Sequence, residues 1–135
     1  MEPVLRHELF PIADIERMVH AFYARVREDS VLGPVFARRI DDWPTHLDRM
    51  VSFWRAVLRG DRTFTMAERG SPPVLHRNIA ELELAHFDRW LTLFREVVES
   101  TFDDSRAVRE VEAAADRIAV ALSRHLAGPG MAIRR

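Results

Sequence analysis

One histidine, His76, is preceded by an unusual sequence for a loop residue. In the stretch GSPPVLHRNI, residues 70–79, it is preceded by Gly70, Pro72 and Pro73 and then by two apolar residues. The prolines fix φ and favour an extended backbone before them, and the glycine allows a tight turn. Such a backbone orients an imidazole in advance, and imidazole is a common ligand of transition metals. By the residues alone, His76 remains a loop histidine with an unusual approach.

His46 is the second histidine in an unusual setting. It shares one stripe of a predicted helix with Met50, Phe53 and Val57, since spacings of four, three and four place them on one face. The sequence contains no HExxH motif and no other pair of histidines one helical turn apart. The remaining histidines are expected to be solvated: His7, His20, His86 and His125.

The helix that carries His46 is apolar on more than one side. Four further residues form a neighbouring apolar stripe: Leu47, Val51, Trp54 and Leu58. Together the two stripes cover more than half of the helix circumference, whereas a surface helix needs only one. Either both sides pack on protein, or one side packs on something else that is large and flat.

Aromatic side chains are predicted at many inward-facing helical positions. These are Phe22, Tyr23, Phe36, Phe53, Trp54, Phe87, Trp90 and Phe94. The simplest interpretation is a core rich in aromatic residues. However, Tyr23, His46 and Trp90 carry polar groups that need partners or a ligand when they are buried. A haem requires a dry, flat, apolar cavity and one imidazole, so these residues are compatible with a haem site.

Composition narrows the remaining classes of function. The 135 residues are 47% hydrophobic and 30% charged, which suits one soluble domain with a real core. The formal net charge of −1 leaves no basic excess for nucleic acid. The lack of cysteine excludes disulfides, thiolate metal sites and a cysteine nucleophile. No apolar run approaches the roughly 20 residues that span a bilayer and the start lacks a signal-peptide core, so we expect a cytoplasmic protein without membrane contact.

Helical periodicity dominates the chain, and strand signals are weak. The apolar spacing predicts long helices over 14–28, 44–58, 83–102 and from about Asp104 or Ser105 to Gly128-Pro129. Gly33 and Pro34 predict a turn and then a short helical piece, and residues 59–71 read as a loop.

Local signals mark the ends of these helices. Asp14 is a plausible N-cap of the first, Pro44 suits the first turn of the second, and Gly60 is placed to end it. The predicted organisation is one all-α domain over 1–135, with flexible termini at 1–12 and 128–135.

Four sequence blocks follow one another in the order found in a known family. They are AFYARVREDSVLGPVF, DDWPTHLDRMVSFWRAVL, GSPPVLHRNI and HFDRWLTLFREVV, which together span roughly residues 19–98. In these blocks the chain resembles the truncated haemoglobins, specifically the third group of that family. The resemblance implies a shortened globin fold, in which two helix pairs form a 2-over-2 sandwich around a haem. The sequence departs from the family at Glu68, where members often carry tyrosine, so the loop from 61 to 69 is expected to follow its own path.

The resemblance also implies roles for single residues. His76 matches the proximal histidine, which binds the iron of haem b. Tyr23, His46 and Trp90 match distal residues that face a ligand of the iron, and Met50 is implied in the distal wall. Arg49 matches a basic position near a haem propionate, and further haem contacts are implied for Phe36, Phe53, Leu75, Phe87 and Phe94.

The function implied by the resemblance is reversible binding of oxygen or another diatomic ligand, such as carbon monoxide or nitric oxide. Hydrogen bonds from Tyr23 and Trp90 to a partly charged ligand are worth about 1–3 kcal/mol each, which predicts slow ligand release. His46 can donate as well, act as a swinging gate, or bind the iron itself in the ligand-free state.

Two other functions stay open at this point. The same scaffold can be an enzyme that acts on peroxide or nitric oxide, with a reductase as partner. The chain can also be a haem-free helical interaction module, in which the aromatic stripes are core and His76 is a loop residue. No apolar helix face is left over for a dimer, so a monomer is expected.

Overall fold

The described part of the chain is built from helices. The computed structural model describes residues 3–62 and 84–132, with side chains described for 6–62 and 86–121. Its elements are α1 Pro3–Leu9, α2 Ile12–Glu28, α3 Leu32–Ala37, α4 Trp43–Arg59, α7 Leu84–Thr101 and α8 Ser105–Ala132. The all-α prediction is therefore confirmed. Within these ranges, no helix is long and apolar enough to cross a membrane.

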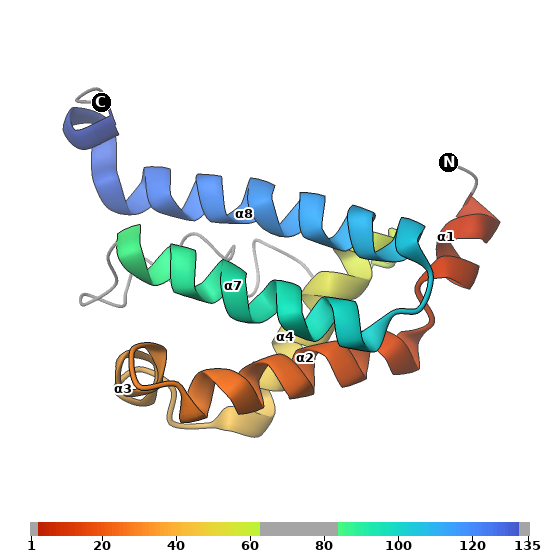
Figure 1. Ribbon diagram of the computed structural model, residues 1–135, viewed down its shortest axis with the longest axis horizontal. Coiled ribbons are helices and arrows are strands. Elements are labelled where there is room, and N and C mark those ends of the chain that lie inside the picture. The colour runs from red at the N-terminus through yellow and green to blue at the C-terminus, as the bar shows by residue number, and fades with distance from the viewer. Residues whose placement is uncertain (1–2, 63–83, 133–135) are drawn as a thin grey trace.

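The helices pack as two pairs. Figure 1 shows α7 and α8 running side by side, while α2 crosses beside α7 and lies against α4. The contact of α2 with α7 joins the two pairs, and the short α3 follows α2 at one end of the molecule. The core lies where these helices meet, and its most deeply buried large side chains include Phe22 and Met18 of α2 and Phe94 of α7.

Local chemistry defines both ends of α4. At its start, Asp42 accepts a hydrogen bond from the backbone N–H of Thr45 at 3.2 Å and caps the helix. At its end, Gly60 takes the left-handed conformation with φ of 78°, which glycine adopts without steric cost. The predictions for Pro44 and Gly60 are thus confirmed, and the helix is one residue longer at each end than 44–58.

Two other predicted helices match α7 and α8 closely at their starts, but α2 begins earlier than expected. It starts at Ile12 after Pro11, so Asp14 lies inside its first turn and the N-cap prediction is wrong. The carboxylate of Asp14 instead pairs with Arg17 one turn later. A proline before the helix already removes one N–H that would need a cap, which explains why Asp14 is not needed there.

The described parts of both chain ends are helical. Within the segment 1–12, α1 forms and Phe10 after it is fully buried at 0% exposure. At the other end, α8 continues through Gly128 and Pro129 to Ala132, beyond the helix end predicted from the sequence. Flexibility of 1–12 and 128–135 stays a prediction. Figure 1 shows α8 changing direction near this end, which is the usual way a helix accommodates proline.

Asp29 fixes the corner between α2 and α3. Its carboxylate accepts hydrogen bonds from the backbone N–H groups of Val31 at 3.0 Å and Leu32 at 2.9 Å. Arg89 of α7 donates a third hydrogen bond through Nε at 2.8 Å. Burial alone would raise the pKa of the Asp29 carboxyl, but these hydrogen bonds outweigh burial and lower it. One charged group thus ties α2, α3 and α7 together.

Gly33 allows the same corner to close tightly. A Cβ atom at this position would lie 2.9 Å from the backbone oxygen of Arg27, closer than side-chain atoms normally approach. Only a glycine therefore fits without a backbone shift. The close approach places Phe36 of α3 within 6.3 Å of the Tyr23 ring, measured between ring centroids.

Candidate functional site

Tyr23 and His46 meet where α2 lies against α4. Their ring centroids are 4.9 Å apart and the ring planes are nearly perpendicular, at 87°. Tyr23 is only 4% exposed, and this burial raises the pKa of its phenol. The hydroxyl therefore keeps its proton at neutral pH and can donate a hydrogen bond. None of the described residues forms a hydrogen bond with it.

Trp90 of α7 joins this pair through one intervening ring. The Phe22 centroid lies 4.8 Å from that of Tyr23 and 5.5 Å from that of Trp90. Trp90 is 8% exposed, and its Nε1 is buried without a hydrogen-bond partner among the described side chains and backbone. Burying such a donor unpaired costs about 1–3 kcal/mol, so an acceptor from a ligand would relieve a real penalty.

A stack of rings supports Trp90 from behind. Phe94 lies one helical turn further along α7, with its ring nearly parallel to Trp90 at 5.4 Å between centroids. It is also stacked with Trp54 of α4 at 5.2 Å. Because these rings are large and closely packed, the indole of Trp90 has little freedom to rotate.

The other predicted site residues fall into three groups. Four are buried in the core: Phe36 on α3, Met50 and Phe53 on α4, and Phe87 on α7. Arg49 is half-buried on α4. His76 and Leu75 lie outside the described residues, as does most of the predicted loop 59–71. The structure thus brings together the distal part of the predicted site.

Trp43 belongs to the same cluster, although the sequence did not indicate it. Its ring lies 5.9 Å from Tyr23 and 5.6 Å from His46 between centroids. It is the first residue of α4, directly before Pro44, and so lies just outside the helix predicted from the sequence. Its spacing of three residues before His46 is the signal that could have placed it on the same face.

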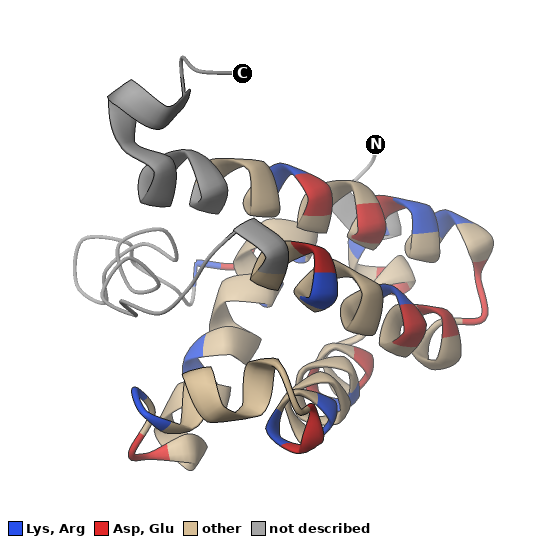
Figure 2. Ribbon diagram, turned by 60° about the vertical axis from the view of Figure 1, so that its left-hand side comes forward, with Lys and Arg blue, Asp and Glu red and all other residues tan. Residues whose placement is uncertain are grey.

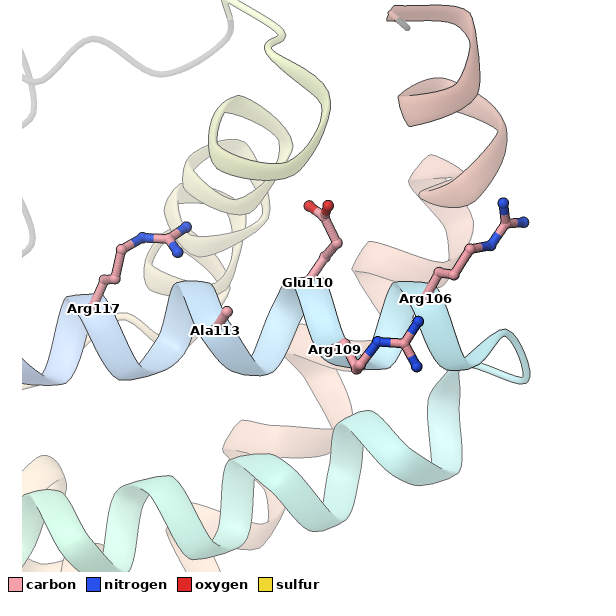
Figure 3. A pocket seen from close by; sticks show the side chains of 5 residues that line it. All are labelled: Arg106, Arg109, Glu110, Ala113 and Arg117. Atoms are coloured by element: carbon pink, nitrogen blue, oxygen red, sulfur yellow. The ribbon is translucent and has the colours of Figure 1, made fainter. Parts of the chain in front are cut away.

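Two surface hollows are lined by described residues, and neither contains a predicted site residue. The larger, about 420 Å³, lies along one face of α8 and is lined by Arg106, Arg109, Glu110, Ala113 and Arg117 (Figure 3). The other, about 300 Å³, lies between α1, the start of α2 and the turn before α8. Figure 2 shows that the part of α8 whose side chains are described carries both signs of charge. Open, charged hollows of this kind offer no dry, apolar surface, so we assign no ligand to them.

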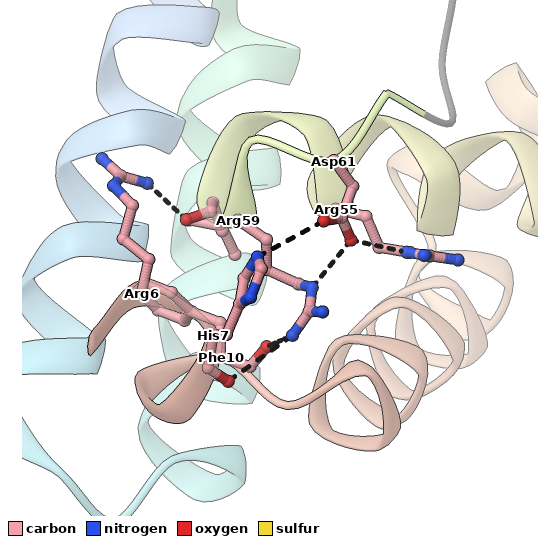
Figure 4. Close-up of polar contacts among 7 residues, drawn as sticks. Arg6, His7, Phe10, Arg55, Arg59 and Asp61 are labelled. Carbon is pink, nitrogen blue, oxygen red and sulfur yellow. Dashed lines mark hydrogen bonds and ion pairs between the residues drawn. The ribbon is translucent and has the colours of Figure 1, made fainter. Parts of the chain in front are cut away.

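A second polar cluster lies at the opposite end of α4 from His46 (Figure 4). Asp61 accepts hydrogen bonds from Nε of Arg59 at 2.7 Å and from Nε of Arg55 at 3.1 Å. Nε2 of His7 lies 3.6 Å from its other oxygen. Arg59 also donates through Nη1 to the backbone oxygen of Phe10 at 2.9 Å. We call these four side chains, His7, Arg55, Arg59 and Asp61, the α1–α4 clasp.

Burial alone would raise the pKa of the Asp61 carboxyl. The hydrogen bonds and positive charges of Arg59 and Arg55 outweigh burial and hold that pKa below its ordinary range. Arg6 of α1 adds a hydrogen bond to the backbone oxygen of Leu58. The clasp therefore attaches α1 to the C-terminal end of α4, at the opposite end of that helix from His46.

Comparison with known proteins identifies the class to which this fold and site belong. The family model of the bacterial-like globins matches residues 8–124, and the chain belongs to this family. The matched range includes α2, α3, α4 and α7 and most of α8.

The similarity extends to a particular group within the globins. The chain is 26% identical over 104 residues to the group 3 truncated hemoglobin ctb of Campylobacter jejuni, which covers 74% of this chain and 79% of that protein. The crystal structure of a group III truncated hemoglobin from Campylobacter jejuni superposes with a TM-score of 0.77 at 25% identity, over 87% of this chain and 91% of that one. The resemblance to the third group and the shortened globin fold are therefore confirmed.

Proposed function

We propose that this chain binds haem b through His76 and takes oxygen or another diatomic ligand on the side where Tyr23, His46 and Trp90 lie. The observation that carries the proposal is the buried Nε1 of Trp90, which has no partner among the described residues. One ring, that of Phe22, separates it from a second buried donor, the phenol of Tyr23, in a chain of the globin family. Two such donors in an apolar surrounding are suited to a small ligand that accepts hydrogen bonds.

The residues present fit a haem. A porphyrin needs flat apolar walls, and Phe36, Met50 and Phe53 are buried next to the distal cluster or on the helix that carries His46. Phe87 lies one turn before the Trp90–Phe94 stack on α7, and Leu75 and Phe94 are proposed as further contacts. Arg49 is half-buried on α4, where a guanidinium can pair with a propionate.

The haem supplies an iron atom to which a diatomic ligand binds, and the protein sets how tightly that ligand is held. Tyr23 donates its phenol hydrogen, which burial keeps in place at neutral pH. Trp90 donates its indole N–H, and the stack behind it fixes the direction of that donor. Hydrogen bonds to a partly charged acceptor are worth about 1.5–3 kcal/mol each, so ligand release is expected to be slow.

Absorption spectroscopy tests the proposal directly. The purified protein, reconstituted with haem, is expected to show a Soret band that shifts when carbon monoxide is added to the reduced form. Protein that takes up no haem, or whose Soret band does not respond to carbon monoxide, would refute the function.

Two histidine variants test which residue binds the iron. His76→Ala is expected to abolish the spectrum of five-coordinate, histidine-ligated haem, because it removes the imidazole proposed as the proximal ligand. His20→Ala is the matched control, since His20 is exposed on α2 and contacts none of the site residues described above. Unchanged spectra in His76→Ala would remove that residue from the iron.

Enzymatic turnover of peroxide or nitric oxide by the same fold is the second candidate function. It is favoured by the polar side chains of Tyr23, His46 and Trp90, because such donors can assist cleavage of the O–O bond of a peroxide. Assays with peroxide, or with nitric oxide and a reductase, distinguish this function from reversible binding.

A further inference from the structure

Trp43 is in ring contact with both Tyr23 and His46. It lies on α4 three residues before His46, and the two ring planes are nearly perpendicular at 87°. On its other side the ring reaches Tyr23 of α2 at a tilt of 56°. Unlike Tyr23 and Trp90, Trp43 is only half-buried and lies at the edge of the core.

Arg27 of α2 restrains Trp43 in turn. Its guanidinium carbon lies 4.7 Å from the centroid of the Trp43 ring, within the range of a cation–π interaction. Arg27 follows Tyr23 by four residues, so both lie on the face of α2 that meets α4. Trp43 and His46 occupy matching positions on α4, three residues apart. The four residues therefore form one interlocked set across the two helices.

We propose that Trp43, held by Arg27, is the positioning residue that keeps the His46 imidazole against the Tyr23 phenol. Two aromatic rings, from Trp43 and Tyr23, lie against His46 at near-perpendicular angles, so a turn of the imidazole would disturb both contacts. Without the indole, only Tyr23 remains of these two, and the imidazole gains room to change its orientation. The inference rests on the proposed function, because it concerns the orientation of a ligand-facing residue.

The alternative is that Trp43 only covers apolar surface. In that case a leucine of similar apolar character would preserve the site, and Arg27 would have no influence on it. If Trp43 instead positions His46, the aromatic ring of Trp43 matters more than its apolar area. The guanidinium of Arg27 then has a measurable effect on the orientation of His46.

The stretching band of carbon monoxide bound to the haem-loaded protein tests the proposal, because its frequency responds to the polar groups around the ligand. Wild type is expected to give a single dominant band. Trp43→Leu is expected to give additional bands, because His46 then samples more than one orientation. Trp43→Phe is expected to retain the single band, because it keeps an aromatic ring against His46 and Tyr23.

Arg27→Gln provides a milder change at an exposed residue that leaves the core intact. Loss of a cation–π contact is expected to shift the ratio of the bands roughly twofold to fivefold. If Trp43→Leu fails to fold, this variant decides the question: an unchanged band ratio overturns the proposal.

The control is Phe102→Leu, which removes a buried ring at the end of α7. Phe102 packs on Phe10 with 6.0 Å between centroids and touches none of the four interlocked residues. It is expected to lower stability without adding bands. Extra bands in this variant, or an unchanged spectrum in Trp43→Leu, would overturn the positioning role. If wild type binds no haem, the proposed function fails; if it binds haem and carbon monoxide normally, only the role of Trp43 is at stake.

Discussion

The polar groups at the two ends of α4 have opposite surroundings. At the C-terminal end, the clasp pairs its charges with one another, and Asp61 alone accepts from two arginines. At the N-terminal end, His46 and Tyr23 are surrounded by rings, and the nearby indole N–H of Trp90 is buried with no acceptor among the described residues. Both ends lie on or against the same helix of 17 residues.

This difference separates groups that stabilise the fold from groups that we propose to bind a ligand. A buried hydrogen bond that is already made contributes to stability, and its loss leaves an unpaired partner. A buried donor with no partner lowers the stability of the fold, because its lost hydration is not replaced, and it is available to a ligand that enters the site. Substitutions at the two ends should therefore change different properties.

The largest expected effect is at the clasp. Asp61→Ala removes a carboxylate that is 15% exposed and leaves two arginines without their acceptor. We expect the free energy of unfolding, measured with urea, to fall by about 2–3 kcal/mol. Carbon monoxide binding by the folded, haem-loaded protein should be unchanged.

The matched control for this substitution is Asp116→Ala on α8. Asp116 pairs with Arg95 at 2.9 Å, but both side chains are about half exposed, at 52% and 47%. A solvated pair of this kind contributes little to stability. Equal losses in the two variants would show that the clasp is no more than a surface ion pair.

The next effect is at the distal pair. Tyr23→Phe removes a hydroxyl that has no hydrogen-bond partner among the described residues, so the stability of the haem-free chain should be unchanged or slightly higher. The off-rate of oxygen, measured by stopped flow, should rise about tenfold, as expected for loss of one charge-assisted hydrogen bond. An unchanged off-rate would exclude Tyr23 from ligand binding.

A smaller effect is expected in the pH dependence of stability. The pKa of Asp61 is lowered in the folded state, so its contribution is present above the ordinary carboxyl pKa of about 3.9 and is lost as pH falls through the lowered value. Urea unfolding of wild type and Asp61→Asn from about pH 6 to about pH 3 should give curves that converge at the acid end. Parallel curves would show that the carboxylate is not stabilised by its arginines.

The smallest effect is expected at Glu112 on α8, where the pH dependence of stability has the opposite sign to that of Asp61. Burial raises the pKa of this carboxyl, and the neighbouring Glu99 raises it further. Its contribution to stability is therefore greatest at low pH and is lost as pH rises from the ordinary value through the raised one. Glu112→Gln should increase the free energy of unfolding at neutral pH by less than about 1 kcal/mol. A decrease at neutral pH would contradict this sign.

The sequence predicted α4 well because its ends depend on local chemistry. Pro44 and Gly60 act through their own backbone preferences, which need no knowledge of the rest of the molecule. In contrast, α1 could not be predicted, since a helix of 7 residues is not stable alone. It depends on Arg59, which follows it by about fifty positions and reaches the backbone oxygen of Phe10.

The distal residues illustrate the same limit. Periodicity placed Tyr23 and His46 on the apolar faces of two helices, but it does not state which faces meet. The family resemblance supplied that pairing, and the ring contact between them agrees with it. Trp43 was missed because it lies one residue before the predicted start of its helix, and helical periodicity was applied only to residues inside the predicted range.

The ring stack has a consequence for how the protein can be observed. The sequence contains three tryptophans, and Trp43, Trp54 and Trp90 all belong to the same connected set of aromatic rings. No indole lies elsewhere to give a background signal. Intrinsic fluorescence should therefore come entirely from the region proposed to hold the haem, and energy transfer to a porphyrin should quench all of it. Titrating haem into the chain while recording emission would count sites without any label.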